Sequence, residues 1–359
     1  MQRNKLSYNG QKIFIGIDVH KNLWGVAVVC EGGFEDYHTQ EPSAEKLFEF
    51  LQKHYPDGEY HAVYESGFSG FSTYYSLVEL GIDCMVINAA DVPTTQYEHT
   101  MKTDQIDARK LARSLKSGLL RGIYIHSKEN IDARSVVRIR RTIQKQLGGC
   151  KSRTKHLLHS NGVTIPERFN KSGSYWSRVF IKWLQEDVQL LSPTRDSLDL
   201  LLEQVSVIRS TLLRANRKVR ELSRSQLYRT RYELLTSVPG IGLNTAMALL
   251  TEVGDFGRFH NEREFASFLG LIPTCHSSGE KTSHEEKTFR GNKTIGPMIV
   301  EAAWVSITRE RGLNCAYSNY RQKMKPQEAI IRIARKLANI IFAVMKTETQ
   351  YVPYQWSNT

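Results

Sequence analysis

The chain has 359 residues, and its 49 Lys and Arg residues against 37 Asp and Glu residues give a formal net charge of +12. This length predicts two or three domains, and the basic balance favours polyanionic partners, with nucleic acid ahead of a ribosomal or membrane-surface role. A hydrophobic fraction of 40% excludes a disordered basic tail, and the lack of a long apolar run predicts a cytoplasmic protein with no membrane partner.

Residues 1–125 alternate between strand-like and helix-like segments. Three β-rich stretches come first, and Gly32-Gly33 forms a turn between the second and third. Ser43 then offers an N-cap to a helix. The further segments are strand 62–65, helix 74–80, strand 84–88 and a helix over about 104–115. Three strands followed by alternating helices and strands is the order of an α/β ribonuclease-H-like fold, which we predict for this first domain.

Residues 126–230 are predicted to form a basic helical and coiled-coil region. Four cations recur at helical spacing and share one face, namely Arg134, Arg138, Arg141 and Lys145. That face is either solvated or in contact with phosphates. A second helix is predicted to begin at Ser192-Pro193, and apolar residues then follow a three-four spacing from Leu198 to Leu222. This seam predicts dimerisation, although an intramolecular helix pair would give the same pattern.

Four carboxylates stand at positions that suit a metal site. Asp18 ends the first strand in IFIGIDVHK, and Glu65 ends a later strand in HAVYES. Asp104 and Asp107, in KTDQIDARKLA, are three apart on a predicted helix and therefore project from one face. Taken singly, such residues are common as turn, cap or helix-dipole residues. Together they predict a cluster that needs cations, and oxygen ligands suit Mg²⁺ or Mn²⁺, with two ions able to assist displacement at phosphorus.

Residues 231–359 are predicted to be a mainly helical domain that contains a helix-hairpin-helix. Two helices flank the segment PGIG, in which Gly240 and Gly242 would let the backbone approach a phosphate, while a plain turn between helices is the alternative. Ser277 and Ser278 precede Gly279 in a predicted loop, and such a sequence is by default a flexible turn. Cations follow at Lys281, Arg290 and Lys293. A final helix over 326–345 carries an apolar face that predicts core packing.

The segments GIDVHK, YESG, INAADV and KTDQIDARKLA resemble the DEDD-type transposases of insertion sequences, the IS110 family. The resemblance runs over nearly the whole chain and implies a prokaryotic protein with a RuvC-like N-terminal domain. It implies that the metal ligands are Asp18, Glu65, Asp104 and Asp107. It also implies a C-terminal transposase domain whose nucleophile is Ser278, with Ser277 as the alternative.

The same resemblance implies partners. They are double-stranded donor and target DNA, a structured non-coding bridge RNA that pairs with both, and further copies of the chain in a tetramer built from dimers. A serine nucleophile would retain the phosphodiester energy in a covalent protein–DNA ester, so strands could be exchanged without ATP.

One loop departs from the family pattern. Relatives often read Lys-x-Gly-Asn followed by Leu-Arg, whereas this chain has Phe289-Arg290-Gly291-Asn292 and then Ile295-Gly296, with Lys287 and Lys293 as candidate replacements for the missing cations. Two other functions stay open from the residues alone. One is a RuvC-like nuclease that uses water on junction DNA, and the other is a non-catalytic DNA-binding architectural protein.

Overall fold

The computed structural model describes residues 7–94, 103–171, 173–272, 276–278, 281–283 and 291–353. The chain divides into two compact units, Met1–Ile125 and His126–Thr359, and each is described by itself. We predicted separate domains over 126–230 and 231–359. In the structure these two regions share one unit, because Val137 and Val219 pack in the same core as the C-terminal helices. Within the described residues, no helix is long and apolar enough to cross a bilayer.

The first unit is built on a five-stranded sheet in the order β3-β2-β1-β4-β5. Its elements are β1 (Lys12–Val19), β2 (Trp24–Cys30), β3 (Glu35–Gln40), α1 (Ala44–His54), β4 (Glu59–Glu65), α2 (Ser72–Glu79), β5 (Asp83–Ile87) and α4 (Asp104–Lys116). The first three strands are antiparallel, and β4 and β5 run parallel to β1. This arrangement is consistent with the predicted ribonuclease-H-like domain. Ser43 caps α1 as predicted, because its side chain accepts a hydrogen bond from the backbone N–H of Lys46.

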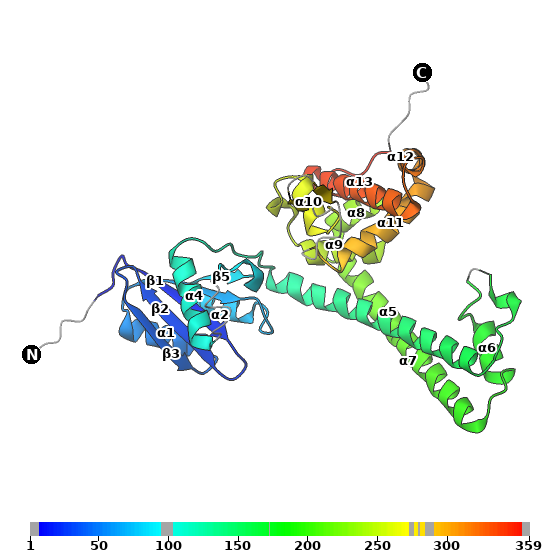
Figure 1. The fold of residues 1–359 in the computed structure, drawn as a ribbon, viewed down its shortest axis with the longest axis horizontal. Coiled ribbons are helices and arrows are strands. Elements are labelled where there is room, and N and C mark those ends of the chain that lie inside the picture. The colour runs from blue at the N-terminus through cyan, green and yellow to red at the C-terminus, as the bar shows by residue number, and fades with distance from the viewer. Residues whose placement is uncertain are drawn as a thin grey trace, which may run out of the picture. The chain divides into compact units, whose positions relative to one another are not determined.

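The two faces of this sheet bury different helices. Ile13, Ile15 and Ile17 alternate along β1 and pack with α1 and α2 on one face. Ala27 and Val29 of β2 point to the other face, where they pack with α4. Figure 1 shows α4 lying across the strands. The α4 face is also the face to which Asp18 belongs, since Asp18 is one residue out of phase with the three isoleucines.

Gly16 lets α4 approach β1 closely. A Cβ placed on Gly16 would lie 2.1 Å from the carbonyl oxygen of Ala108 and 2.6 Å from the backbone nitrogen of Ala112. Both atoms belong to the backbone of α4, so no side-chain rotation could relieve the overlap. The position of α4 over the strand that carries Asp18 therefore depends on the absence of a side chain at residue 16.

Gly16→Ala should destabilise the first unit by about 1–3 kcal/mol, because the added methyl group forces α4 away from the sheet. Urea unfolding followed by circular dichroism would measure the change. Gly32→Ala is the matched control, since a Cβ at Gly32 meets no atom within 4 Å. Equal stability of the two variants would show that α4 is not held at this contact.

The second unit is mainly helical. Its elements are α5 (Lys128–Ser160), α6 (Arg178–Glu186), α7 (Ser192–Ser223), α8 (Arg229–Ser237), α9 (Leu243–Val253), α10 (Glu262–Phe268), β6 (His276–Ser278), β7 (Lys281–Ser283), α11 (Ile295–Arg309), α12 (Arg311–Arg321) and α13 (Pro326–Thr347). Helix α7 begins at Ser192 with a proline in its first turn, as predicted. The apolar face predicted for the last helix is also confirmed, because Ile333, Leu337 and Ile341 of α13 are fully buried.

The apolar seam of α7 packs within the same chain. Helices α5 and α7 run side by side, with α6 at their far end (Figure 1). Leu198, Leu202 and Val205 of α7 share one core with Leu147 and Cys150 of α5. The structure therefore shows the intramolecular helix pair that we kept as the alternative, and dimerisation stays a prediction. The three-four spacing indicates a helix that packs against another helix, and in this chain α7 packs against α5.

Candidate active site

Asp18 and Glu65 lie at the ends of neighbouring parallel strands. The register of β1 and β4 pairs Gly16 with Val63 and Ile17 with Tyr64. One residue further along both strands come Asp18 and Glu65. Since residues two apart share a face, Glu65 points to the same side as Val63, which packs against Leu111 of α4. The sheet thus directs both carboxylates toward α4.

The first turn of α4 brings two more carboxylates to this end of the sheet. Thr103 caps the helix by accepting a hydrogen bond from the backbone N–H of Ile106, and Asp104 and Asp107 follow in the first turn. Gly25 pairs with Asp18, and a Cβ at Gly25 would lie 3.6 Å from the carbonyl oxygen of Asp104. The start of α4 therefore lies directly above the end of β1.

The side chains at this end form a close group. Nε2 of His20 lies 3.1 Å from Oδ2 of Asp18 and 3.7 Å from Oδ1 of Asp104. Asp107 is turned toward Lys110, whose Nζ lies 3.1 Å from Oδ1 of Asp107, and both side chains are largely buried. Among the described residues, the one cluster whose ligand atoms all lie within 4.8 Å of one another contains Asp18, His20 and Asp104. Glu65 and Asp107 lie outside that tight group.

Electrostatics show that this cluster would gain from a cation. Burial raises the pKa of the Asp18 carboxyl above its usual value. The ring of His20 opposes this change, whereas the negative charges of Asp104 and Asp107 add to it. Such crowding of carboxylates is relieved by a divalent ion, and oxygen donors of this kind fit Mg²⁺ or Mn²⁺. The donor set present here therefore fits the metal that the sequence predicts.

Three residues near the cluster were not part of the sequence prediction. They are His20, Lys110 and Tyr37. Gly25 pairs with Asp18, and a Cβ at Gly25 would lie 3.1 Å from the hydroxyl oxygen of Tyr37. Burial raises the pKa of the Tyr37 hydroxyl, and the charges of Asp104 and Asp18 raise it further. Lys110 was recoverable as a helical neighbour three residues after Asp107. His20 follows Asp18 by two residues, but only the turn between β1 and β2 shows that its ring folds back.

The predicted serine belongs to the second unit. We predicted a loop around Ser277 and Ser278, but both lie in β6, which pairs antiparallel with β7 so that Ser278 is opposite Lys281. Gly279, Arg290 and Lys287 lie outside the described residues.

The PGIG segment joins α8 to α9 as a tight turn, but its two glycines have different surroundings. Gly240 has a φ of +88°, and a Cβ there would lie 2.3 Å from Oγ of Ser306 and 2.4 Å from the carbonyl oxygen of Ala302. Helix α11 thus packs against the side of Gly240 where a side chain would lie, and a phosphate contact by the backbone of Gly240 stays a prediction. Gly242 is exposed with open space around it, and it begins α9 with no side-chain cap. Backbone N–H groups at such a helix start are free to bind an anion.

Two of the four predicted phosphate-binding cations on α5 form ion pairs with one buried carboxylate. Nη2 of Arg134 lies 2.8 Å from Oε2 of Glu252, and Nε of Arg138 lies 2.6 Å from Oε1. The side chain of Glu252 is 1% exposed. Burial alone would raise the pKa of Glu252, but the hydrogen bonds from Arg138 and Arg134 outweigh it and lower the pKa to about 2. Arg134 and Arg138 therefore tie α5 to α9, and a phosphate contact by either of them stays a prediction.

Glu252→Gln should lower the free energy of unfolding of the second unit by roughly 2–4 kcal/mol, because two guanidinium groups would lose their counter-charge at a buried position. Urea titration at neutral pH would measure this loss. Glu233→Gln removes an exposed ion pair with Arg229 and should cost less than about 0.5 kcal/mol. A small effect at both positions would mean that the buried pair is not a structural tie.

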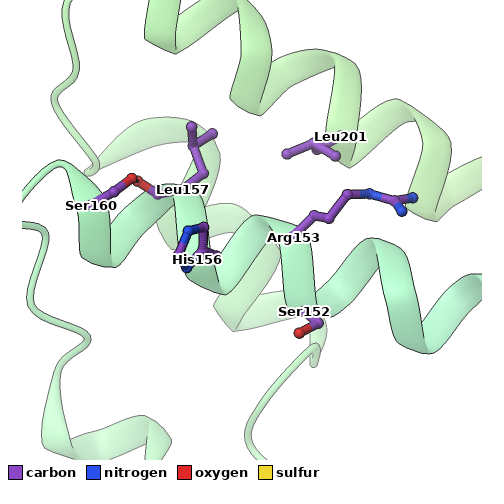
Figure 2. A pocket seen from close by; sticks show the side chains of 6 residues that line it. All are labelled: Ser152, Arg153, His156, Leu157, Ser160 and Leu201. Carbon is purple, nitrogen blue, oxygen red and sulfur yellow. The ribbon is translucent and has the colours of Figure 1, made fainter.

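The rest of α5 presents a solvent-facing basic surface. Residues 133–166 contain no Asp or Glu. Lys145 is exposed, and Arg141 donates a 3.5 Å hydrogen bond to the carbonyl oxygen of Lys293, which is also exposed. Further along the helix lies a shallow pocket, shown in Figure 2, whose walls are formed by Ser152, Arg153, His156, Leu157, Ser160 and Leu201. Its polar groups come from α5, and Leu201 comes from α7.

Comparisons with known proteins give two separate family matches. Residues 15–161 match a DEDD-type IS110 family described as "Transposase", and residues 232–318 match the "Transposase IS116/IS110/IS902 family". The chain belongs to the IS110 family of DEDD-type transposases. The first match spans the strand and the helix that carry the acidic cluster.

Individual IS110-type relatives cover most of the chain. The transposase for insertion sequence element IS1533 of Leptospira borgpetersenii is 28% identical over 82% of this chain and 85% of its own length. The putative transposase y4qE of Sinorhizobium fredii is 26% identical over 82% of this chain and 72% of its own. A shorter match, 34% identical over 32% of this chain and 37% of the relative, is to the pilin gene-inverting protein of Moraxella bovis.

Proposed function

We propose that this transposase excises and inserts a mobile element through attack of Ser278 on DNA phosphodiesters, assisted by divalent ions that Asp18, Glu65, Asp104 and Asp107 bind. The observation that carries the proposal is the approach of Asp18 and Asp104 at one end of the sheet, with ligand atoms within 4.8 Å of a shared neighbour, His20. Both carboxylates come from the segments that resemble the family's metal ligands.

The carboxylates would hold Mg²⁺ or Mn²⁺, and we propose two ions. Bound there, the ions would stabilise the negative charge that develops on the phosphorus oxygens. Asp18 is the central ligand in this scheme, since it neighbours Glu65 on the next strand and lies beneath Asp104 on α4. Lys110 keeps Asp107 oriented through their 3.1 Å ion pair.

The serine would perform the covalent step. Its hydroxyl oxygen forms a bond to phosphorus, the bond from phosphorus to a sugar oxygen breaks, and the serine proton ends on that departing oxygen. One phosphoester thus replaces another, so the energy of the DNA backbone is kept for rejoining. Lys281, opposite Ser278 in the β6–β7 pair, places a cation on the same hairpin.

Phosphate contacts are proposed on the surfaces that remain available. Arg141, Lys145 and Lys293 lie on or beside the exposed part of α5, and Gly242 opens the start of α9. Arg290 and Lys281 are further candidates from sequence. Contacts of this kind position the duplex without reading its sequence. Site choice would then rest on a structured bridge RNA encoded by the element.

The carboxylates belong to the first unit and Ser278 to the second. We propose that they act together in an assembly of dimers that forms a tetramer on donor and target DNA. Within one chain, α5 covers the seam of α7, so an assembly of this kind would use surfaces that this packing leaves exposed. Action in the cytoplasm, at the nucleoid, follows from this DNA substrate.

The test is capture of a protein–DNA adduct that survives denaturation. Purified protein is incubated with RNA transcribed from the element and DNA that carries the element ends, with Mg²⁺ or Mn²⁺ present. We expect an adduct that disappears when EDTA is added and returns when the ion is restored. An adduct that forms equally well in EDTA would refute metal assistance. Metal-dependent cutting without any adduct would favour the water-using nuclease, whose carboxylates would be the same.

A further inference from the structure

We propose that His20 is a direct ligand of the ion held by Asp18 and Asp104, and that its nitrogen shifts the preference of this site from Mg²⁺ toward Mn²⁺. This inference rests on the proposed metal site and specifies its ligand set. His20 lies in the turn between β1 and β2, where its backbone N–H donates to the carbonyl oxygen of Leu23 at 3.2 Å. The turn directs the ring back over the end of β1.

The distances fit coordination. Nε2 of His20 lies 3.1 Å from one carboxylate oxygen and 3.7 Å from the other. With bonds of about 2.1 Å, an octahedral ion holds adjacent ligand atoms about 3.0 Å apart and opposite ones about 4.2 Å apart. Both observed separations fall between these values. A small adjustment of three partly exposed side chains would seat one ion among them.

The contacts of the His20 ring point to metal binding. Its side chain is 55% exposed, so hydrophobic packing does not set its orientation. The ring nitrogen that faces Asp18 is the same one that faces Asp104. A histidine that only oriented Asp18 would need to contact that one carboxylate. The His20 nitrogen lies near both carboxylates, as a third ligand of a common ion would.

The nitrogen donor has a chemical consequence. Sites built only from oxygen suit Mg²⁺, which dehydrates reluctantly and prefers oxygen ligands. Imidazole nitrogen favours the transition ions, and affinity along that series rises from Mn²⁺ onward. A site with two carboxylates and one imidazole therefore discriminates against Mg²⁺ more strongly than the four-carboxylate set predicted from the sequence.

The test is pulsed electron paramagnetic resonance of Mn²⁺ bound to the full-length protein, which detects a directly bonded ¹⁴N nucleus. We expect ¹⁴N modulation in the wild type, and its loss in His20→Ala with Mn²⁺ affinity reduced at least about tenfold. His20→Asp should restore tight binding without ¹⁴N modulation and lower the ratio of Mn²⁺ to Mg²⁺ affinity. His61→Ala is the control, since it removes another His–Asp pair of the same unit, His61 with Asp83, and should keep the signal.

The outcomes separate this inference from the proposed function. Mn²⁺ that binds the wild type without ¹⁴N modulation, and is lost in Asp18→Asn, would overturn the role of His20 and leave the carboxylate site standing. Unchanged ¹⁴N modulation in His20→Ala would also overturn it. Failure of the wild type to bind Mn²⁺ or Mg²⁺, with or without DNA, would overturn the metal site itself and this inference with it.

Discussion

Replacing Asp18 with asparagine should reduce metal-dependent DNA cleavage on the order of 10³-fold, because the change removes charge from the side chain nearest the other ligands while keeping its shape. Burial already raises the pKa of this carboxyl, and Asp104 and Asp107 surround it with like charge. A metal ion is therefore worth more to Asp18 than to a solvated aspartate. Single-turnover cleavage of DNA with element ends, over a range of Mn²⁺ concentrations, would measure the loss.

The matched control for this change is Asp83→Asn. Asp83 begins β5 and is exposed, with His61 as its partner at 2.8 Å. Its loss should leave cleavage within about twofold of the wild type, since surface substitutions away from special features have small effects. If Asp18→Asn cleaved DNA as well as Asp83→Asn, the acidic cluster would have no catalytic role, and a non-catalytic DNA-binding function would be the better reading.

Ser278→Ala should abolish the covalent adduct and lower strand exchange by at least about 10⁴-fold, because no other group would receive the phosphoryl bond. Denaturing gels of radiolabelled DNA after reaction would show the adduct in the wild type only. Metal binding should be unchanged, since the carboxylates belong to the other unit. Loss of the adduct together with unchanged metal binding would distinguish a nucleophile from a residue that only supports the fold.

Ser277→Ala provides the comparison on the same strand. Both serines lie in β6, and their partners across the hairpin are Thr282 and Lys281. The two hydroxyls belong to adjacent residues, so substituting each in turn tells which one forms the adduct. An adduct that persists in Ser278→Ala and is lost in Ser277→Ala would move the nucleophile by one residue. Cleavage that survives both changes would favour water as the nucleophile.

The sheet and its acidic end were largely predictable from the sequence. Alternation along Ile13, Ile15 and Ile17 fixed which residues of β1 are buried, and therefore that Asp18 lies on the opposite face. The three-residue spacing of Asp104 and Asp107 placed both in one helical turn. These are local patterns, and local patterns survive in the fold because strand and helix periodicity determine side-chain direction.

The features that the sequence left open depend on partners far away in the chain. Helical spacing placed Arg134 and Arg138 on one face, but nothing nearby in sequence indicated Glu252 as their acceptor. The seam of α7 has the same period whether its partner is α5 or a second molecule. Gly240 is the kind of turn residue that a phosphate site uses, but the sequence did not indicate that Ala302 and Ser306 of α11 pack beside it. Sequence patterns specify a face, whereas tertiary packing decides what covers it.

The two ends of α9 serve different neighbours. Helix α9 begins directly after the exposed Gly242. Near its other end, Glu252 forms ion pairs with Arg134 and Arg138 of α5. An 11-residue helix is about 16 Å long and does not bend easily. A nucleic-acid backbone bound at the start of α9 would thus lie at a distance from α5 that the length of α9 determines. The distance of such a backbone from α5 would therefore depend on the ion pairs of Glu252 with Arg134 and Arg138.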